Sequence, residues 1–268
     1  MTFNENLRAI INQKKSCLSI GLDVDMELIP GFLLDFEAPI LEFNKSIINA
    51  TSDVAAAYKM NLSFYEAYSV QGWRSLKKTL ELIPDSVMKI ADGKRGDVAH
   101  SAKKYRDAFF KELSFDAVTL NPYLGYDSVA PFLEDESKGA FIVCLTSNES
   151  ATEFQFFSDG KTLLFERIAE KAAEWNINDN CGLVVGATKA NHLKRIREIA
   201  PNLPILIPGV GAQGGDLKAS VENARDSRGG GFLINSSRAI LYHSDDFEFA
   251  QKSRTAAWKL RDEINQYL

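Results

Sequence analysis

The sequence predicts a single α/β domain built as a (β/α)8 TIM barrel, and three of its features support that fold. Short apolar runs recur along the 268 residues, each run is continuous rather than alternating, and helical patterns separate the runs. Continuous apolar strands are typical of parallel sheets that are covered on both faces. Strict alternation of strands and helices implies right-handed crossovers, and eight such units favour closure of the sheet. We therefore expect residues 1–268 to form one barrel domain.

The eight candidate strands are the short apolar runs themselves. In chain order they are Cys17–Leu22, Ala55–Met60, Val87–Ala91, Ala117–Leu120, Ala140–Leu145, Leu183–Val185, Ile205–Ile207 and Phe232–Ile234.

Helical stripes, with apolar residues three and four positions apart, lie between or after these runs. The stripes are Ala102, Tyr105, Phe109 and Leu113; Phe165, Ile168, Ala169 and Ala172; Leu193, Ile196 and Ile199; and Ala257, Leu260, Ile264 and Leu268. Thr188 is a candidate N-cap for the third stripe. We expect all four stripes to face the core.

Composition and charge argue against several other classes of protein. Hydrophobic residues make up 45% of the chain and charged residues 25%, which is ordinary for a globular protein. A net charge of -5 disfavours a nucleic-acid-binding surface. The first residues, MTFNENLRAI, lack the pattern of a signal peptide, and no apolar run approaches the roughly 20 residues that span a bilayer. We expect a cytoplasmic protein with three buried, unpaired cysteines, Cys17, Cys144 and Cys181, and no zinc site.

Charged residues gather where the first three strands end. Asp23 follows the first strand, Lys59 lies at the end of the second, and Asp92-Gly93-Lys94-Arg95-Gly96-Asp97 follows the third. Side chains alternate along a strand, so Asp92 and Lys94 should point the same way, into the mouth of the barrel. A solvated turn with surface ion pairs is the alternative for this motif alone. Repeated placement at strand ends favours a functional site, because buried charges are costly unless they are paired.

A glycine-rich loop follows the seventh strand, over Pro208–Asp216. Gly209, Gly211 and Gly214 match the G-x-G-x-x-G of dinucleotide-binding folds. That interpretation is disfavoured, because the motif lies late in the chain and residues 229–231 are glycines where an acidic residue would be expected.

A phosphate site explains the glycine-rich loop better. Glycines let backbone N–H groups approach an anion, and the loops after the seventh and eighth strands of such barrels commonly hold phosphate. Arg238 follows the eighth strand and is placed to grip phosphate with a forked guanidinium, while Gln213 could donate from the neighbouring loop.

Taken together, these segments resemble the orotidine 5′-monophosphate decarboxylase family. The resemblance is carried by Lys59, by Asp92-x-Lys94-x-x-Asp97, by the Pro208–Asp216 loop and by Arg238. Asn121-Pro122-Tyr123-Leu124-Gly125 and Thr146-Ser147-Asn148 are similar to the longer bacterial-type branch. The resemblance extends from the first strand to the eighth.

The resemblance implies a cofactor-free, metal-free homodimer that converts orotidine monophosphate to uridine monophosphate and CO2 in de novo pyrimidine biosynthesis. It implies that Lys94 protonates C6 of the pyrimidine and that Asp97 reaches the neighbouring subunit's active site. The charged network would be Lys59, Asp92, Lys94 and Asp97, and the substrate contacts would come from Asp23, Ser101, Asn121, Ser147, Pro208, Gly209, Gln213 and Arg238.

Within these substrate contacts, Asp23 and Lys59 would hold ribose hydroxyls, and Ser147 would face the amide edge of the pyrimidine. Gln213 and Arg238 would hold phosphate. The sequence departs from the family pattern twice, with Ser101 in place of threonine and Leu145 in place of a basic residue.

Three rival interpretations remain open, because a fold does not determine a function. One is a sugar-phosphate enzyme of the same superfamily that uses the shared acids to hold Mg²⁺. Another is a non-catalytic barrel that binds a phosphate ligand, and the third is a purely structural barrel. In the decarboxylase that the resemblance implies, the polar segment from Thr146 to Lys161 could act as a lid.

Overall fold

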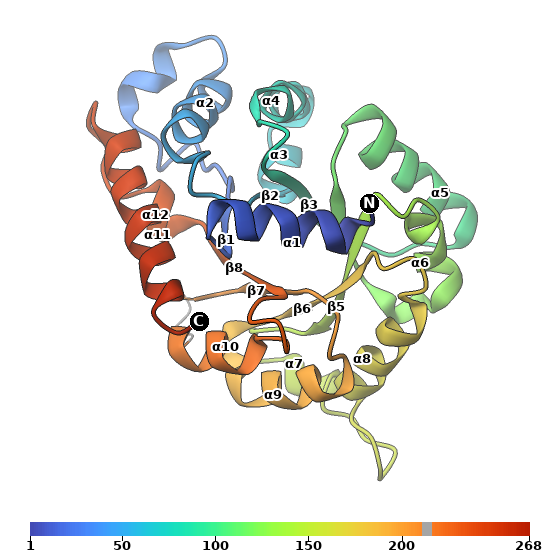
Figure 1. Cartoon of the computed structure of the whole chain (residues 1–268). Helices are drawn as coiled ribbons and strands as arrows, with labels where there is room; N and C mark the ends of the chain where they lie inside the picture. The colour runs from blue at the N-terminus through green and yellow to red at the C-terminus, as the bar shows by residue number, and fades with distance from the viewer. Residues whose placement is uncertain (211–215) are drawn as a thin grey trace.

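Eight parallel strands close into a barrel in the computed structural model, which describes residues 1–210 and 216–268 (Figure 1). The strands are β1 (Leu18–Gly21), β2 (Ala57–Asn61), β3 (Met88–Arg95), β4 (Ala117–Leu120), β5 (Gly139–Leu145), β6 (Cys181–Val185), β7 (Ile205–Pro208) and β8 (Phe232–Ser236). Each strand pairs with its neighbours in chain order, and β8 pairs with β1. The predicted barrel and its eight strands are confirmed.

Helices surround this barrel (Figure 1). The longer ones are α1 (Phe3–Lys14), α2 (Pro39–Thr51), α4 (Ser69–Leu82), α5 (Ala99–Arg106), α6 (Tyr126–Leu133), α8 (Leu164–Trp175), α9 (Ala190–Ile199), α10 (Leu217–Ala224) and α12 (Phe249–Asn265). Shorter helical segments are η1 (Gly31–Asp35), α3 (Ser63–Glu66), the π-helix η2 (Asp107–Glu112), η3 (Pro122–Leu124), α7 (Ala151–Phe154), η4 (Ala187–Lys189) and α11 (Arg238–Leu241). Across residues 1–210 and 216–268, none is long and apolar enough to cross a lipid bilayer.

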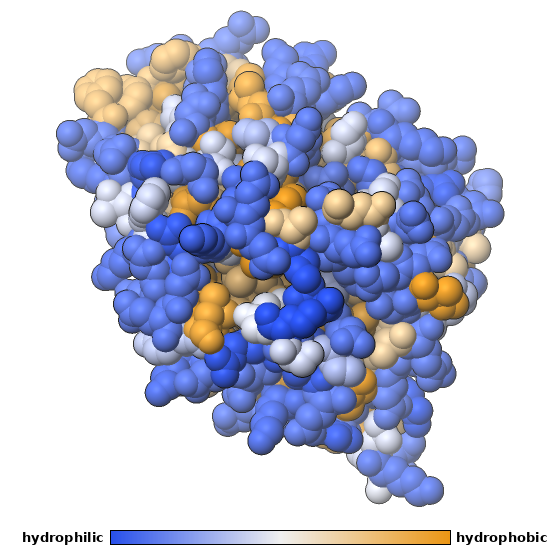
Figure 2. Space-filling view, in the orientation of Figure 1, coloured by the Kyte–Doolittle hydropathy of each residue, from blue (hydrophilic) through white to orange (hydrophobic). Residues whose placement is uncertain are grey.

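Helix α1 closes the N-terminal end of the barrel. The N–H of Phe3 donates to the carbonyl of Glu136 at 2.7 Å, and that of Asn4 donates to Asp179 at 3.2 Å; these carbonyls precede β5 and β6. Figure 1 shows α1 lying across the strands, and Figure 2 shows the same view as mostly hydrophilic. Because a helix covers this end, the C-terminal ends of the strands are left to carry a site.

Some details of the predicted helices are wrong. Tyr105 is 36% exposed and does not face the core; the Arg95 guanidinium lies over its ring, 5.5 Å from the ring centroid. Leu268 is exposed because α12 ends before it. Thr188 does not cap α9; its hydroxyl donates to the Ser147 carbonyl instead, at 3.3 Å.

A buried arginine ties together the segments that lead into β7 and β8. The Arg197 guanidinium donates hydrogen bonds of 2.6–3.3 Å to the backbone carbonyls of Ala200, Pro201, Leu203, Ala224 and Gly231. Burial lowers the pKa of Arg197 to about 10, so it stays charged at neutral pH. One side chain thus supplies charged donors to backbone carbonyls of several segments, most of them buried.

We expect Arg197→Met to destabilise the barrel by about 3 kcal/mol or more, because several buried carbonyls lose charged donors at once. The free energy of unfolding, from equilibrium urea titration, measures this loss. Arg195→Met is the matched control on the same helix: Arg195 is half-exposed and pairs with Glu166 at 2.8 Å, so its loss should change little. Equal unfolding midpoints for the two variants would contradict the role given to Arg197.

Candidate active site

A cavity of about 600 Å³ opens at the C-terminal ends of the strands. The predicted site residues that line it are Asp23, Lys59, Asp92, Lys94, Ser147, Pro208, Gly209 and Arg238. Residues from both early and late strands meet there, as a closed barrel requires. The charged strand ends and the predicted phosphate loop therefore face one shared space.

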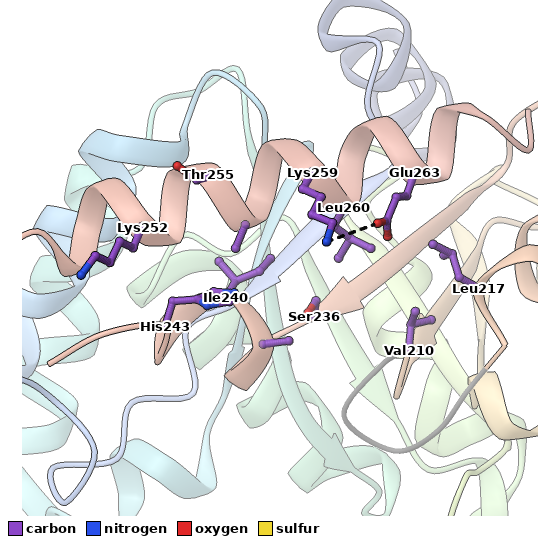
Figure 3. Close-up of a pocket in the computed structure, with 12 residues that line it drawn as sticks. Val210, Leu217, Ser236, Ile240, His243, Lys252, Thr255, Lys259, Leu260 and Glu263 are labelled. Atoms are coloured by element: carbon purple, nitrogen blue, oxygen red, sulfur yellow. Dashed lines mark ion pairs between the residues drawn. The ribbon is translucent and has the colours of Figure 1, made fainter.

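A second cavity, of about 530 Å³, lies outside the barrel against α12 (Figure 3). Figure 3 shows aliphatic and polar side chains together there, with Lys259 and Glu263 forming an ion pair along the helix at 4.0 Å. None of the predicted catalytic residues lines this cavity. The chemistry that the sequence predicts therefore belongs to the barrel mouth.

The Asp92 carboxylate lies between two ammonium groups. Lys59 Nζ is 2.8 Å from Asp92 Oδ2, and Lys94 Nζ is 2.7 Å from Asp92 Oδ1. Lys59 Nζ is also 3.7 Å from Asp23 Oδ1. Lys59 is only 3% exposed, whereas the Lys94 side chain is 48% exposed and reaches the cavity. The array thus alternates in charge, and one lysine is free to meet a ligand.

The electrostatics of this array keep its buried members ionised. Burial acts to raise the pKa of Asp92, but Lys59 and Lys94 outweigh it and hold that pKa well below its usual range. Burial likewise acts to lower the pKa of Lys59, but Asp23 and Asp92 outweigh it and raise that pKa. Both groups therefore carry their charges at neutral pH.

Asp23 is fixed by contacts from three directions. Its Oδ2 accepts from Ser237 Oγ at 2.7 Å, and its Oδ1 accepts from the Asn61 N–H at 3.0 Å. The Tyr242 hydroxyl donates to the Asp23 carbonyl at 3.0 Å and accepts from the Asp25 N–H at 2.8 Å. Sequence reasoning missed Ser237 and Tyr242. Ser237 adjoins the predicted Arg238 and could have been included, whereas Tyr242 gives no signal in the sequence.

The part of the cavity lined by residues after β7 and β8 is suited to an anion. Arg238 begins α11 and is exposed, and its guanidinium has no hydrogen bond or ion pair with any residue that the structure describes. Pro208 and Gly209 lie beside it, with Gly209 at a φ of 95° that favours glycine. Gln213 falls outside the described residues.

The loop after β5 brings Ser147 to the same cavity. Thr146, next to it, is held by Gln155: the Thr146 N–H donates to Gln155 Oε1 at 2.8 Å. A Cβ on Gly186 would lie 2.7 Å from the Ser147 nitrogen, so only glycine allows this approach. Leu145 has an uncharged side chain and is fully buried outside the cavity lining, so this position supplies no cation to a ligand.

Asp97, Ser101 and Asn121 do not line the cavity of their own chain. The Asp97 carboxylate accepts from the Val98 N–H at 2.8 Å, and Asn121 Oδ1 accepts from the Tyr123 N–H at 3.0 Å. The structure of one chain does not bring Ser101 and Asn121 to its own cavity, and their contact with substrate stays a prediction. The predicted reach of Asp97 into a second subunit stays a prediction.

Metal-ligating side chains do not cluster in the part of the chain that the structure describes. Within residues 1–210 and 216–268, no group of three or more His, Cys, Asp or Glu side chains is arranged to hold one. The three cysteines are buried free thiols, as predicted, and burial raises the pKa of Cys17 and Cys181 to about 12.

Comparison with known proteins agrees with this geometry. Residues 16–252 match the model of the Orotidine 5′-phosphate decarboxylase / HUMPS family. The chain is 48% identical to an orotidine 5′-phosphate decarboxylase of Dehalococcoides mccartyi, covering 100% of this chain and 98% of the relative. It is 44% identical to that of Flavobacterium johnsoniae, covering 98% and 97%.

Solved structures give the same result. The Leishmania donovani OMP decarboxylase superposes with a TM-score of 0.88 at 36% identity, covering 100% of this chain and 99% of that one. The Leishmania donovani UMP synthase superposes with a TM-score of 0.90 at 38% identity, covering 100% of this chain and 56% of that one. The charged array, the open barrel mouth and these full-length similarities place the chain in the orotidine 5′-phosphate decarboxylase / HUMPS family.

Proposed function

We propose that this protein is a carboxy-lyase that converts orotidine 5′-monophosphate to uridine 5′-monophosphate and CO2 in pyrimidine biosynthesis. Relatives that match over their full length at 42–48% identity are named orotidine 5′-phosphate decarboxylase, and this supports the proposed activity. The observation that carries the proposal is the Lys59–Asp92–Lys94 array in a cavity that Arg238 also lines.

The reaction needs a fixed cation beside C6 of the pyrimidine. When the bond from C6 to the carboxylate breaks, the electron pair stays on C6 in the plane of the ring, where no carbonyl can accept it. The Lys94 ammonium, oriented by Asp92 at 2.7 Å, stabilises this charge and then transfers a proton from Nζ to C6. Solvent reprotonates the lysine, and the reaction is balanced without an oxidant or reductant.

The remaining polar groups of the cavity bind the rest of the nucleotide. Arg238 grips the phosphate, with Gln213 as its partner from the glycine-rich loop. Asp23 and Lys59 bind ribose hydroxyls, and Ser147 faces the amide edge of the pyrimidine. Binding energy gained at the phosphate is then available to hold C6 against Lys94.

A cofactor-free and metal-free reaction is favoured over the Mg²⁺-dependent rival. Asp23 and Asp92 are the acids closest to the chemistry, and the Lys59 ammonium already lies between them at 3.7 and 2.8 Å. A divalent cation placed there would be repelled by Lys59. Activity in the presence of EDTA separates the two interpretations.

Lys94→Ala should lower kcat by at least about 10³-fold, because it removes both the stabilising charge and the proton donor. The decrease in orotidine monophosphate absorbance, followed in EDTA, measures turnover, and calorimetric titration with uridine monophosphate shows whether binding persists. Lys77→Ala removes an exposed lysine from α4 and serves as the control. Near-normal turnover by Lys94→Ala would exclude the proposed proton donor.

Arg238→Ala should weaken binding of uridine monophosphate by roughly 10–100-fold, the cost of losing a charged hydrogen-bond donor to phosphate. Binding of uridine, which lacks the phosphate, should stay the same. Titration of each variant with both ligands gives the comparison. Equal losses for nucleotide and nucleoside would mean that Arg238 acts on the shape of the cavity rather than on phosphate.

The proposed homodimer explains why Asp97 lies outside its own cavity. Exposed apolar side chains accompany the Asp97 and Asn121 loops, namely Val98, Tyr123, Leu124 and Tyr126. The two loops adjoin, since a Cβ on Gly96 would lie 2.9 Å from the Asn121 carbonyl. A second subunit that covers this surface would receive Asp97 at its own active site.

Mixing two inactive variants tests this arrangement. Lys94→Ala and Asp97→Ala should each have very low activity alone. Mixed after subunit exchange, they should recover about a quarter of wild-type activity, because half of the dimers are mixed and each has one intact site. Steady-state rates before and after exchange are the measurement. No recovery despite demonstrated exchange would place Asp97 in its own subunit's site.

A further inference from the structure

The pairing of β3 with β4 is irregular at the catalytic lysine. Ala91 pairs with Val118 and Arg95 pairs with Leu120, so Asp92, Gly93 and Lys94 all lie opposite one residue, Thr119. Lys94 has a φ of 45°, in the left-handed region that disfavours a residue with a side chain. Bulges of this kind redirect side chains near active sites, and the surrounding structure must hold them in place.

The Thr119 hydroxyl contacts both ends of this bulge. Its Oγ1 accepts from the Lys94 N–H at 2.9 Å and donates to Asp92 Oδ1 at 2.9 Å. That carboxylate oxygen also receives the Lys94 ammonium at 2.7 Å. One hydroxyl therefore holds the backbone of the lysine and, through Asp92, the head of the same side chain.

Thr119 does not contact the ligand space itself. It is 1% exposed and is not among the residues that line the barrel-mouth cavity. A hydroxyl has one hydrogen to donate and two lone pairs, and here it uses both functions on the catalytic bulge. Its β-branch limits rotation about χ1, which keeps the oxygen pointed at β3.

We propose that Thr119 is a positioning residue that holds the β3 bulge and thereby fixes the Lys94 ammonium against C6 of the substrate. This inference rests on the proposed decarboxylase function. Without the hydroxyl, the Lys94 N–H and one Asp92 oxygen lose a partner, and the strained backbone at Lys94 is free to relax. The ammonium group then no longer occupies one fixed position, and positional errors of this kind lower the rate of the chemical step.

Three substitutions separate this role from simple packing. Thr119→Val keeps the shape and removes the hydroxyl, Thr119→Ser keeps the hydroxyl, and Thr119→Ala removes it without crowding if the valine variant does not fold. Thr79→Val is the matched control, because Thr79 is a fully buried threonine whose hydroxyl accepts a hydrogen bond from Asn44 on the outer helices. All variants are assayed as the full chain with orotidine monophosphate, with kcat and KM obtained separately.

The expected result is a loss of about 10–100-fold in kcat for Thr119→Val and Thr119→Ala, with KM and uridine monophosphate affinity changed little. Thr119→Ser should recover most of kcat, and Thr79→Val should lower the melting temperature but leave kcat unchanged. Wild-type kcat in both hydroxyl-free variants would overturn the positioning role alone. A folded wild-type protein that does not decarboxylate orotidine monophosphate would overturn the proposed function and this inference with it.

Discussion

The Asp92 carboxylate, held between the ammonium groups of Lys59 and Lys94, is the interaction on which the rest of the site depends. A buried lysine at the end of a strand costs several kcal/mol unless an acid compensates it, and Lys59 is 3% exposed. Asp92 supplies that compensation with one oxygen and orients Lys94 with the other. Removal of this carboxylate would leave the ammonium groups of Lys59 and Lys94 without the acid that they share. The charges and positions of the three residues therefore depend on one another.

Closure of the barrel makes this arrangement rigid. Parallel strands in register place the ends of β1, β2 and β3 at one rim, so Asp23, Lys59 and Asp92 meet without any long loop to position them. The last strand also contributes to the site. Ser237 follows β8, which pairs with β1, and its hydroxyl donates to the Asp23 carboxylate at 2.7 Å. The N-terminal end, closed by α1 and tied by Arg197, carries stability, and the C-terminal end is left for chemistry.

The fold and the charged array could be predicted because each leaves a signal that is local in the sequence. Continuous apolar runs mark strands, and an acid or lysine at the end of such a run marks the rim, which is how Asp23, Lys59, Asp92 and Lys94 were found. Thr119 was missed because threonine is common in strands and gives no sign of a special role. Its proposed role depends on a register shift between β3 and β4 that cannot be predicted from the residue pattern. The prediction that Tyr105 is buried also failed, because its ring packs against the Arg95 guanidinium, a partner that the apolar spacing does not reveal.

Charge balance explains why the proposed second subunit matters to the chemistry. Within one chain, Lys59 and Lys94 are offset by Asp23 and Asp92, so the array is nearly neutral. An added carboxylate from Asp97 of the partner subunit would make it negative beside the substrate carboxylate, while Lys94 stays fixed near C6. Loss of CO2 would relieve that repulsion as the lysine neutralises the new carbanion. Under the proposed function, this balance would favour release of an acid group, and Lys59, which lies between Asp23 and Asp92, would repel a divalent metal.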